Sequence, residues 1–180
     1  MKKIILILLF ISFTTALFSN KSYRILSRGV VRDNSTNLLW TRCSLSDNDN
    51  PIYDFNCDGT RKEYSWDEAV DVCKNLVFEN RSDWRLPSIR ELQSIMFFHH
   101  YSTGSTNFSQ LVERVFPSVV SSEEYTNGFA VIHYWSSTPY KYNLSNRWFV
   151  DMKYGNTGFS SQVNLFGLPV KKYVRCVAGP

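Results

Sequence analysis

The residues of this sequence with the clearest chemistry are its four cysteines, Cys43, Cys57, Cys73 and Cys176. Their even number, together with an N-terminal export signal, predicts an oxidising compartment and two structural disulfides. Four cysteines can pair in three ways. We favour Cys43–Cys57, which closes a polar loop, with Cys73–Cys176, which closes a long one, and the other pairings remain open. No Cys-x-x-Cys pair is present, which argues against a zinc site or a redox-active dithiol.

Basic and aromatic residues gather in the C-terminal half of the chain. Arginine and lysine suit sulfate and carboxylate groups, while aromatic rings stack on the faces of sugars. Strand alternation would place Lys171, Tyr173 and Arg175 on one face. The alternative is an ordinary solvated strand face. The candidate ligand-binding residues are Lys141, Arg147, Trp148, Lys153, Lys171, Lys172, Tyr173 and Arg175.

A second pattern, Asp54-x-Asn56-x-Asp58-Gly59, matches the first half of a calcium-binding loop, in which alternating oxygen ligands surround a hard cation. The closing glutamate of such a loop is missing, because Ser65 occupies its position. The loop also contains Cys57. We therefore expect a solvated disulfide loop and no cofactor, with calcium as the weaker alternative.

Enzyme motifs are missing from the sequence. It contains no Gly-x-Ser-x-Gly elbow, no phosphate-binding loop and no His-Glu-x-x-His. His99 and His100 are adjacent, so on a helix they would point about 100° apart and would not readily share a metal. We expect no catalytic residues and no enzyme activity.

Two helices are predicted to position these groups. Ser65 and Glu68 form one capping-box pattern, and Ser88 and Glu91 form a second. In the first helix an apolar stripe carries Cys73 towards the core. That stripe consists of Trp66, Ala69, Val70, Cys73 and Val77. The buried side of the second helix consists of Ile89, Leu92, Ile95 and Met96.

Strand-like segments occupy most of the remaining chain. Residues 28–42 read as a hairpin, and residues 110–116 as a short third helix. A turn is expected at 154–158. Further strands are expected at 131–137, 147–153, 159–165 and 171–177. Because helices and strands are segregated along the chain, the predicted class is α+β.

The first 20 residues read as a secretory leader. Lys2 and Lys3 precede an apolar run, residues 4–13, which is too short for a comfortable bilayer span. Residues 21–180 then form a single domain without a transmembrane segment. The net charge of +4 falls by two when the leader is removed, which is too small to argue for nucleic-acid binding.

The motif Trp84-Arg85-Leu86-Pro87-Ser88-Ile89-Arg90-Glu91-Leu92 resembles the Lcl C-terminal-domain family, which is named after a bacterial collagen-like adhesin. Trp84, Leu86 and Trp135 read as core residues, and Arg85 as a partner for Glu91 or for a carbonyl. Further matches in order are Leu38-Leu39-Trp40, Tyr64-x-Trp66 with Ala69 and Cys73, Tyr134-Trp135-Ser136-Ser137-Thr138, Trp148-Phe149-Val150-Asp151 with Gly155, and Tyr173-Val174-Arg175-Cys176-Val177.

The resemblance implies a C-type-lectin-like fold: two helices packed on small antiparallel sheets, with a disulfide from the first helix to the last strand. It also implies an extracellular binding module, since the adhesin's domain recognises sulfated glycans. The sugar-binding signatures of calcium-dependent lectins, Glu-Pro-Asn or Gln-Pro-Asp with Trp-Asn-Asp, are absent from this sequence.

The predicted function is therefore that of an exported, adhesin-like module that binds an acidic or sulfated glycan or a surface protein, in the periplasm, at the cell surface or after release. Homo-oligomerisation is compatible with this reading. One alternative is an envelope protein-interaction or assembly module without a sugar ligand. A minor alternative is an oxidase of the formylglycine-generating type, which would need a reactive cysteine pair.

Overall fold

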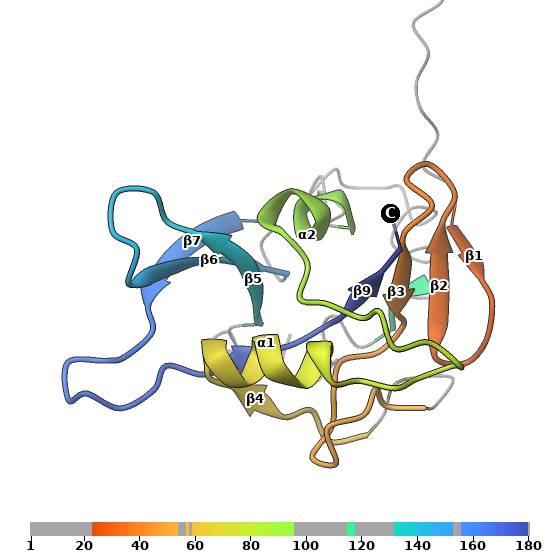
Figure 1. The fold of residues 1–180 in the computed structure, drawn as a ribbon, viewed down its shortest axis with the longest axis horizontal. Helices are drawn as coiled ribbons and strands as arrows, with labels where there is room; N and C mark the ends of the chain where they lie inside the picture. The colour runs from red at the N-terminus through yellow and green to blue at the C-terminus, as the bar shows by residue number, and fades with distance from the viewer. Residues whose placement is uncertain are drawn as a thin grey trace, which may run out of the picture.

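The structure is a computed structural model that describes residues 23–53, 57, 59–95, 115–117, 132–152 and 156–179. The leader prediction for residues 1–20 lies outside these ranges. Within them, Figure 1 shows two sheets at opposite sides of the molecule and two helices between them.

The first sheet has four strands in the order β1-β2-β3-β9, all antiparallel. The predicted hairpin at 28–42 is confirmed as β2 and β3, while β1 and the separate pairing of β9 were not predicted. The strands are β1 (Tyr23–Ile25), β2 (Val30–Asp33), β3 (Leu39–Thr41) and β9 (Val177–Ala178).

The second sheet has five strands in the order β4-β8-β5-β6-β7. Its strands are β4 (Glu63–Tyr64), β5 (His133–Pro139), β6 (Asn146–Asp151), β7 (Asn156–Ser161) and β8 (Lys172–Tyr173). The sheet is mixed, because β8 runs parallel to β5. The expectation of purely antiparallel sheets is therefore wrong for β5 and β8. A long connection, and not a tight turn, leads from β7 to β8, so β8 can lie beside β5 in the parallel direction.

The helices begin where the capping patterns predicted. α1 (Trp66–Lys74) carries a complete capping box, in which the Ser65 hydroxyl accepts from the Glu68 amide and the Glu68 carboxylate accepts from the Ser65 amide. In α2 (Ile89–Ile95) the Glu91 carboxylate accepts from the Ser88 amide at 2.7 Å. These bonds satisfy backbone donors that have no partner inside a helix.

One position of the predicted α1 stripe is wrong. The helix ends at Lys74 with Asn75 as its C-cap, so Val77 lies beyond it and is 72% exposed. Periodicity alone does not show where the last turn stops. The rest of the helix buries Ala69 and Cys73 as predicted.

The five-stranded sheet carries core on both faces. Consecutive β5 residues point to opposite sides, as strand geometry requires. Tyr134 packs in a cluster with Leu92 of α2, whereas Trp135 packs in a cluster with Ala69 of α1. The predicted core residues Trp84, Leu86 and Trp135 are all buried.

Both favoured disulfides are present. Cys43–Cys57 closes the polar loop, and Cys73–Cys176 joins α1 to the segment just before β9. No free cysteine remains, and all four cysteines are among the described residues. The structure therefore leaves no thiol for the oxidase alternative.

The C-terminal strand predictions need correction. β7 begins at Asn156, where a turn was expected, and ends at Ser161. The expected strand at 171–177 is divided into β8 and β9, which belong to different sheets. Of the expected third helix, only residues 115–116 are described; residues 110–114 and Met96 lie outside the described ranges. No helix in those ranges has the length and apolar character to cross a bilayer.

Candidate functional site

Four aromatic side chains meet at one end of the larger sheet, where β5 and β7 end and β6 begins. We call Tyr140, Tyr142, Trp148 and Phe159 the aromatic cluster. Tyr140 and Phe159 are stacked, with ring centroids 4.0 Å apart and planes 8° apart. Trp148 meets both rings edge-on, at 5.5 and 5.8 Å, and Tyr140 meets Tyr142 at 5.5 Å.

Strand register explains this meeting. Trp148 of β6 is the direct cross-strand partner of Phe159 in β7. Opposed aromatic residues on neighbouring strands stabilise each other. The turn from β5 to β6 then brings Tyr140 and Tyr142 over the pair. Trp148 is among the predicted ligand-binding residues but Phe159 is not, because the sequence does not show the register in which the two strands pair.

The cluster is partly open to solvent. Tyr142 is 75% and Phe159 is 48% exposed. The turn that carries Tyr142 is held by hydrogen bonds from the Tyr140 amide to the Asn146 carbonyl and from the Asn143 amide to the Tyr140 carbonyl. A fixed, exposed set of rings can stack against an apolar face of a ligand with little loss of side-chain entropy.

One cation is close to these rings. Lys141 is exposed, and its Nζ lies 4.5 Å from the Tyr142 ring centroid. A lysine beside an aromatic ring retains its hydrated charge and can still pair with an anion. Lys141 and Trp148 are the two predicted ligand-binding residues that the structure brings to this place.

Arg147 is turned away from the cluster. Side chains alternate along β6, so Arg147 and Trp148 lie on opposite faces. The Arg147 guanidinium sits 4.1 Å over the Trp66 ring and donates to the carbonyls of Leu144 and Asn146. Arg147 therefore joins α1 to the β5–β6 turn and supports the cluster from behind.

Lys172 is buried, with 6% of its surface exposed. Its Nζ lies 4.1 Å from the Phe149 ring centroid, 4.8 Å from that of Trp135 and 3.4 Å from Nδ1 of His133. Burial lowers the pKa of Lys172 to about 8, although the charge of Glu63 opposes this. Lys172 is therefore held among rings inside the sheet.

His133 completes this internal cluster. Burial and the neighbouring Lys172 charge lower the pKa of His133 to about 4, although Asp151, 3.6 Å from its Nε2, acts in the other direction. The imidazole is neutral at pH 7. Perturbed groups of this kind mark functional sites in some proteins, but here Lys172 is buried between aromatic rings and His133 is half-buried against Phe149, so the pair is structural.

Arg175 is also internal, with 1% of its surface exposed. Its Nη1 donates to the Thr41 carbonyl at 2.8 Å and to the Arg42 carbonyl, and its guanidinium packs against Phe116 and Tyr134. Arg175 thus ties the C-terminal segment to the end of β3 and the residue that follows it.

The predicted common face of Lys171, Tyr173 and Arg175 is wrong. The strand stops at Tyr173, after which the chain crosses towards the other sheet, so the alternation does not continue. Tyr173 is half-buried under the Arg61 guanidinium at 4.7 Å. Lys171 is exposed. The hydrogen bond from the Ser65 amide is the main cause that lowers the pKa of Glu68, and the Lys171 charge adds a smaller effect in the same direction.

Two groups of predicted site residues lie outside the described residues. The first is the predicted ligand-binding residue Lys153, and the second is the set of calcium candidates, Asp54, Asn56 and Asp58. Within the ranges that are described, no three His, Cys, Asp or Glu side chains come together as a metal-binding group.

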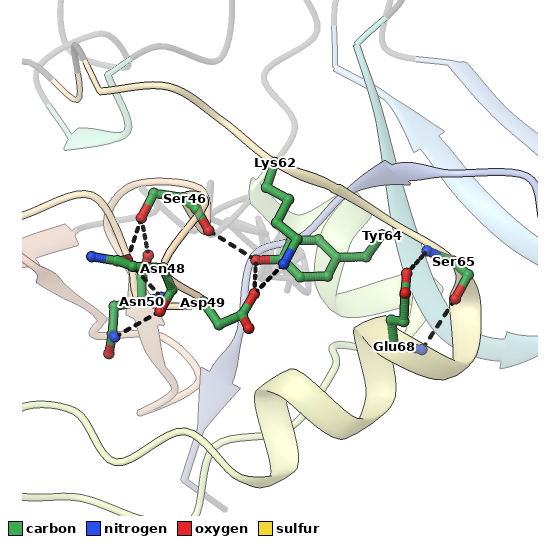
Figure 2. A network of polar contacts seen from close by, with 8 residues as sticks. All are labelled: Ser46, Asn48, Asp49, Asn50, Lys62, Tyr64, Ser65 and Glu68. Atoms are coloured by element: carbon green, nitrogen blue, oxygen red, sulfur yellow. Dashed lines mark hydrogen bonds and ion pairs between the residues drawn. The ribbon is translucent and has the colours of Figure 1, made fainter.

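A cavity of about 500 Å³ lies beside α1, between the helix and the 48–50 loop. Figure 2 shows its polar wall. Asp49 accepts from Lys62 Nζ at 2.7 Å and from the Tyr64 hydroxyl at 2.9 Å, and the bond from Lys62 leads in lowering its pKa. These groups satisfy one another, so the cavity is a weaker candidate than the aromatic cluster. From the sequence, this loop was predicted only to be solvated, without a cavity beside it.

Comparison with known proteins gives one match. The family model described as the Lcl C-terminal domain matches residues 29–178, which is most of the chain. No curated protein and no solved structure matches the chain significantly.

Proposed function

Because this chain belongs to the Lcl C-terminal domain family, we propose that it is an exported, adhesin-like binding module that recognises an acidic or sulfated glycan without catalysis. The observation that carries the proposal is the stacked Tyr140–Phe159 pair, with Tyr142 exposed beside it and Lys141 next in the chain.

The chemistry of the aromatic cluster suits such a ligand. The C–H faces of a sugar ring pack on exposed aromatic rings, and the tyrosine hydroxyl remains available for hydrogen bonding. The Lys141 ammonium supplies a counter-charge for a sulfate or carboxylate. Lys171 is a second exposed cation in the C-terminal half. Arg147, Lys172 and Arg175 act in this proposal as supports and not as ligand contacts.

We propose a C-type-lectin-like arrangement for the domain. In support, Cys73–Cys176 joins the first helix to the C-terminal segment, and two short helices pack beside small sheets. Because the calcium-dependent sugar signatures are absent from the sequence, the proposed binding requires no metal and no cofactor.

Export of residues 21–180 after removal of a leader, residues 1–20, is part of the proposal. Two disulfides support it, because such bonds persist in oxidising compartments such as the periplasm or the extracellular space.

Binding to immobilised heparin and to a glycan array, with and without calcium, tests the proposal. We expect Tyr142→Ala to weaken binding about threefold to tenfold, which is the usual worth of an aromatic contact. Lys141→Gln should weaken it and reduce its salt dependence. Tyr53→Ala is the matched control, because Tyr53 is 54% exposed and packs on Phe78 away from the cluster.

Equal retention of wild type, Tyr142→Ala and Tyr53→Ala would contradict the proposed site. Retention equal to that of a charge-matched unrelated protein would contradict glycan recognition itself. Capture of a specific surface protein that glycan competitors do not displace would favour the protein-interaction alternative.

A further inference from the structure

The connection from β7 to β8 presents large apolar side chains to solvent. It projects from the side of the molecule, at the lower left of Figure 1. Leu165 is fully exposed, Phe166 is 87% exposed, and Leu168 is 61% exposed. We call residues 163–169 the apolar tip. Neither the family match nor the proposed glycan site accounts for it.

The backbone of the apolar tip is closed on itself. The Asn164 amide donates to the Leu168 carbonyl at 2.8 Å, and the Gly167 amide donates to the Asn164 carbonyl at 3.0 Å. The Asn164 side-chain oxygen accepts from the amides of Phe166 and Leu168 at 2.9 and 3.0 Å. Gly167 has φ of +74°, a value that glycine adopts without strain.

Bridging at the base completes the turn. Val163 and Pro169 form a β-bridge, and the Val170 amide donates to the Gln162 carbonyl at 2.8 Å. Pro169 has no amide hydrogen to satisfy. The side chains therefore project from an ordered loop whose backbone donors are largely used internally.

Because these amides are bonded within the turn, few backbone donors would lose water if the apolar tip entered an apolar phase. In hydrocarbon an unsatisfied amide is costly, so a segment that enters lipid must satisfy its own backbone. From this combination we propose that the apolar tip inserts into the interfacial region of a lipid bilayer that contains anionic lipid.

Charge favours an anionic surface. After Asp151 the sequence contains no aspartate or glutamate. Of the described cations in this stretch, Lys172 and Arg175 are buried, so Lys171 is the one that can face a membrane surface. Lys171 is exposed and follows Pro169 by two residues. A basic residue near a membrane is attracted to acidic headgroups. The carboxylate that interacts with Lys171, that of Glu68, belongs to α1 and not to the apolar tip.

The shape of the apolar tip favours lipid over a protein partner. A fully exposed Leu165 on a convex turn would require a matching pocket in a protein, whereas acyl chains adapt to any convex apolar surface. Peripheral proteins use exposed leucine and phenylalanine side chains together with lysine for reversible binding of this kind.

Flotation of the full chain, residues 1–180, with lipid vesicles tests the proposal. We expect binding to vesicles of phosphatidylcholine mixed with phosphatidylglycerol, and about tenfold weaker binding by the double variant Leu165→Ser, Phe166→Ser. Val77→Ser is the control, since Val77 is an apolar residue that is 72% exposed but lies after α1 and outside the apolar tip. Lys171→Gln should weaken binding to the mixed vesicles but not to phosphatidylcholine alone.

A local probe separates the apolar tip from the apolar run at residues 4–13, which could itself hold the chain on lipid. Phe166→Trp should show fluorescence quenching by brominated acyl chains beyond that of wild type. Quenching equal to that of wild type would overturn the proposal. So would self-association in the absence of lipid that the double variant abolishes, because the occupant would then be a second copy of the chain.

Neither outcome bears on the aromatic cluster, whose test is heparin binding by Tyr142→Ala. Failure of the lipid proposal and failure of the glycan proposal are therefore distinguishable.

Discussion

The Nζ atom of Lys172 lies 3.4 Å from Nδ1 of His133, inside a sheet that closes Trp135 and Phe149 around the lysine. Two groups that carry positive charge when protonated thus share one partly dry space, and the Lys172 charge makes protonation of His133 less favourable. The acid stability of the protein should depend on this pair.

We expect the free energy of unfolding to rise with pH between about 4 and 6.5. The folded-state pKa of His133 is about 4, below its ordinary value of 6.5, so the unfolded chain binds the proton first. His133→Gln should remove about 2 kcal/mol of this rise. Urea unfolding of both proteins across this range measures the difference; parallel curves would contradict the assignment.

The same pair can be tested from the lysine side. Lys172→Met replaces the ammonium with an apolar chain of similar length, so the pKa of His133 should rise towards its ordinary value. NMR titration of His133 measures the shift, with Lys171→Met as the control at an exposed neighbour. An unchanged pKa in Lys172→Met would show that burial alone sets it.

The Arg85–Glu91 pair should stabilise the entry to α2. Arg85 donates to both carboxylate oxygens of Glu91, at 2.9 and 2.7 Å, as the sequence analysis had proposed for this residue. Arg85→Ala should lower the free energy of unfolding by about 1 kcal/mol, a value discounted because Arg85 is partly exposed.

The contribution of this pair should depend on pH. Burial acts to raise the pKa of Glu91, but the bonds from Arg85 and Ser88 outweigh it and the pKa is lowered. The stabilisation is therefore present at neutral pH and lost on acidification. Arg90→Ala, at an exposed α2 position, is the control; an equal loss from both variants would count against the pair.

The two disulfides should differ in their contributions to stability. Cys73–Cys176 spans 103 residues and Cys43–Cys57 spans 14. In the chain-entropy model they contribute about 5 and about 3 kcal/mol, respectively. Thermal unfolding of the two double-alanine variants compares them. A smaller loss from Cys73→Ala, Cys176→Ala would be the contrary result.

Gly158 should not tolerate a side chain. A Cβ atom there would lie 2.6 Å from Cζ of Phe149, the ring that packs on Lys172. Gly158→Ala should therefore cost about 1–3 kcal/mol. Thr157→Ala, at the exposed neighbouring position, should cost far less; chemical denaturation of both variants shows whether the Phe149 ring can give way without cost.

Sequence patterns of short range predicted the parts of the structure that depend on nearby residues. Each capping box joins residues three apart, so Ser65 with Glu68 and Ser88 with Glu91 were sufficient to start both helices. The Arg85–Glu91 pair is also a short-range contact, since the two residues are six positions apart in the sequence. The preference for Cys73–Cys176 followed from pairing Cys43 with Cys57 across the polar loop, which leaves Cys73 and Cys176 to join the first helix to the last strand.

The predicted ligand site required information that the sequence does not hold. Lys172 and Arg175 lie in one basic stretch, but the chain moves from one sheet to the other between β8 and β9 and buries both. Phe159 joins Tyr140 only through the β6–β7 register. The starts of both helices follow from the sequence alone, because hydrogen bonds between residues three apart set them. Which charged and aromatic residues face solvent depends on strand pairing between residues far apart in the chain, so it follows only from the folded structure.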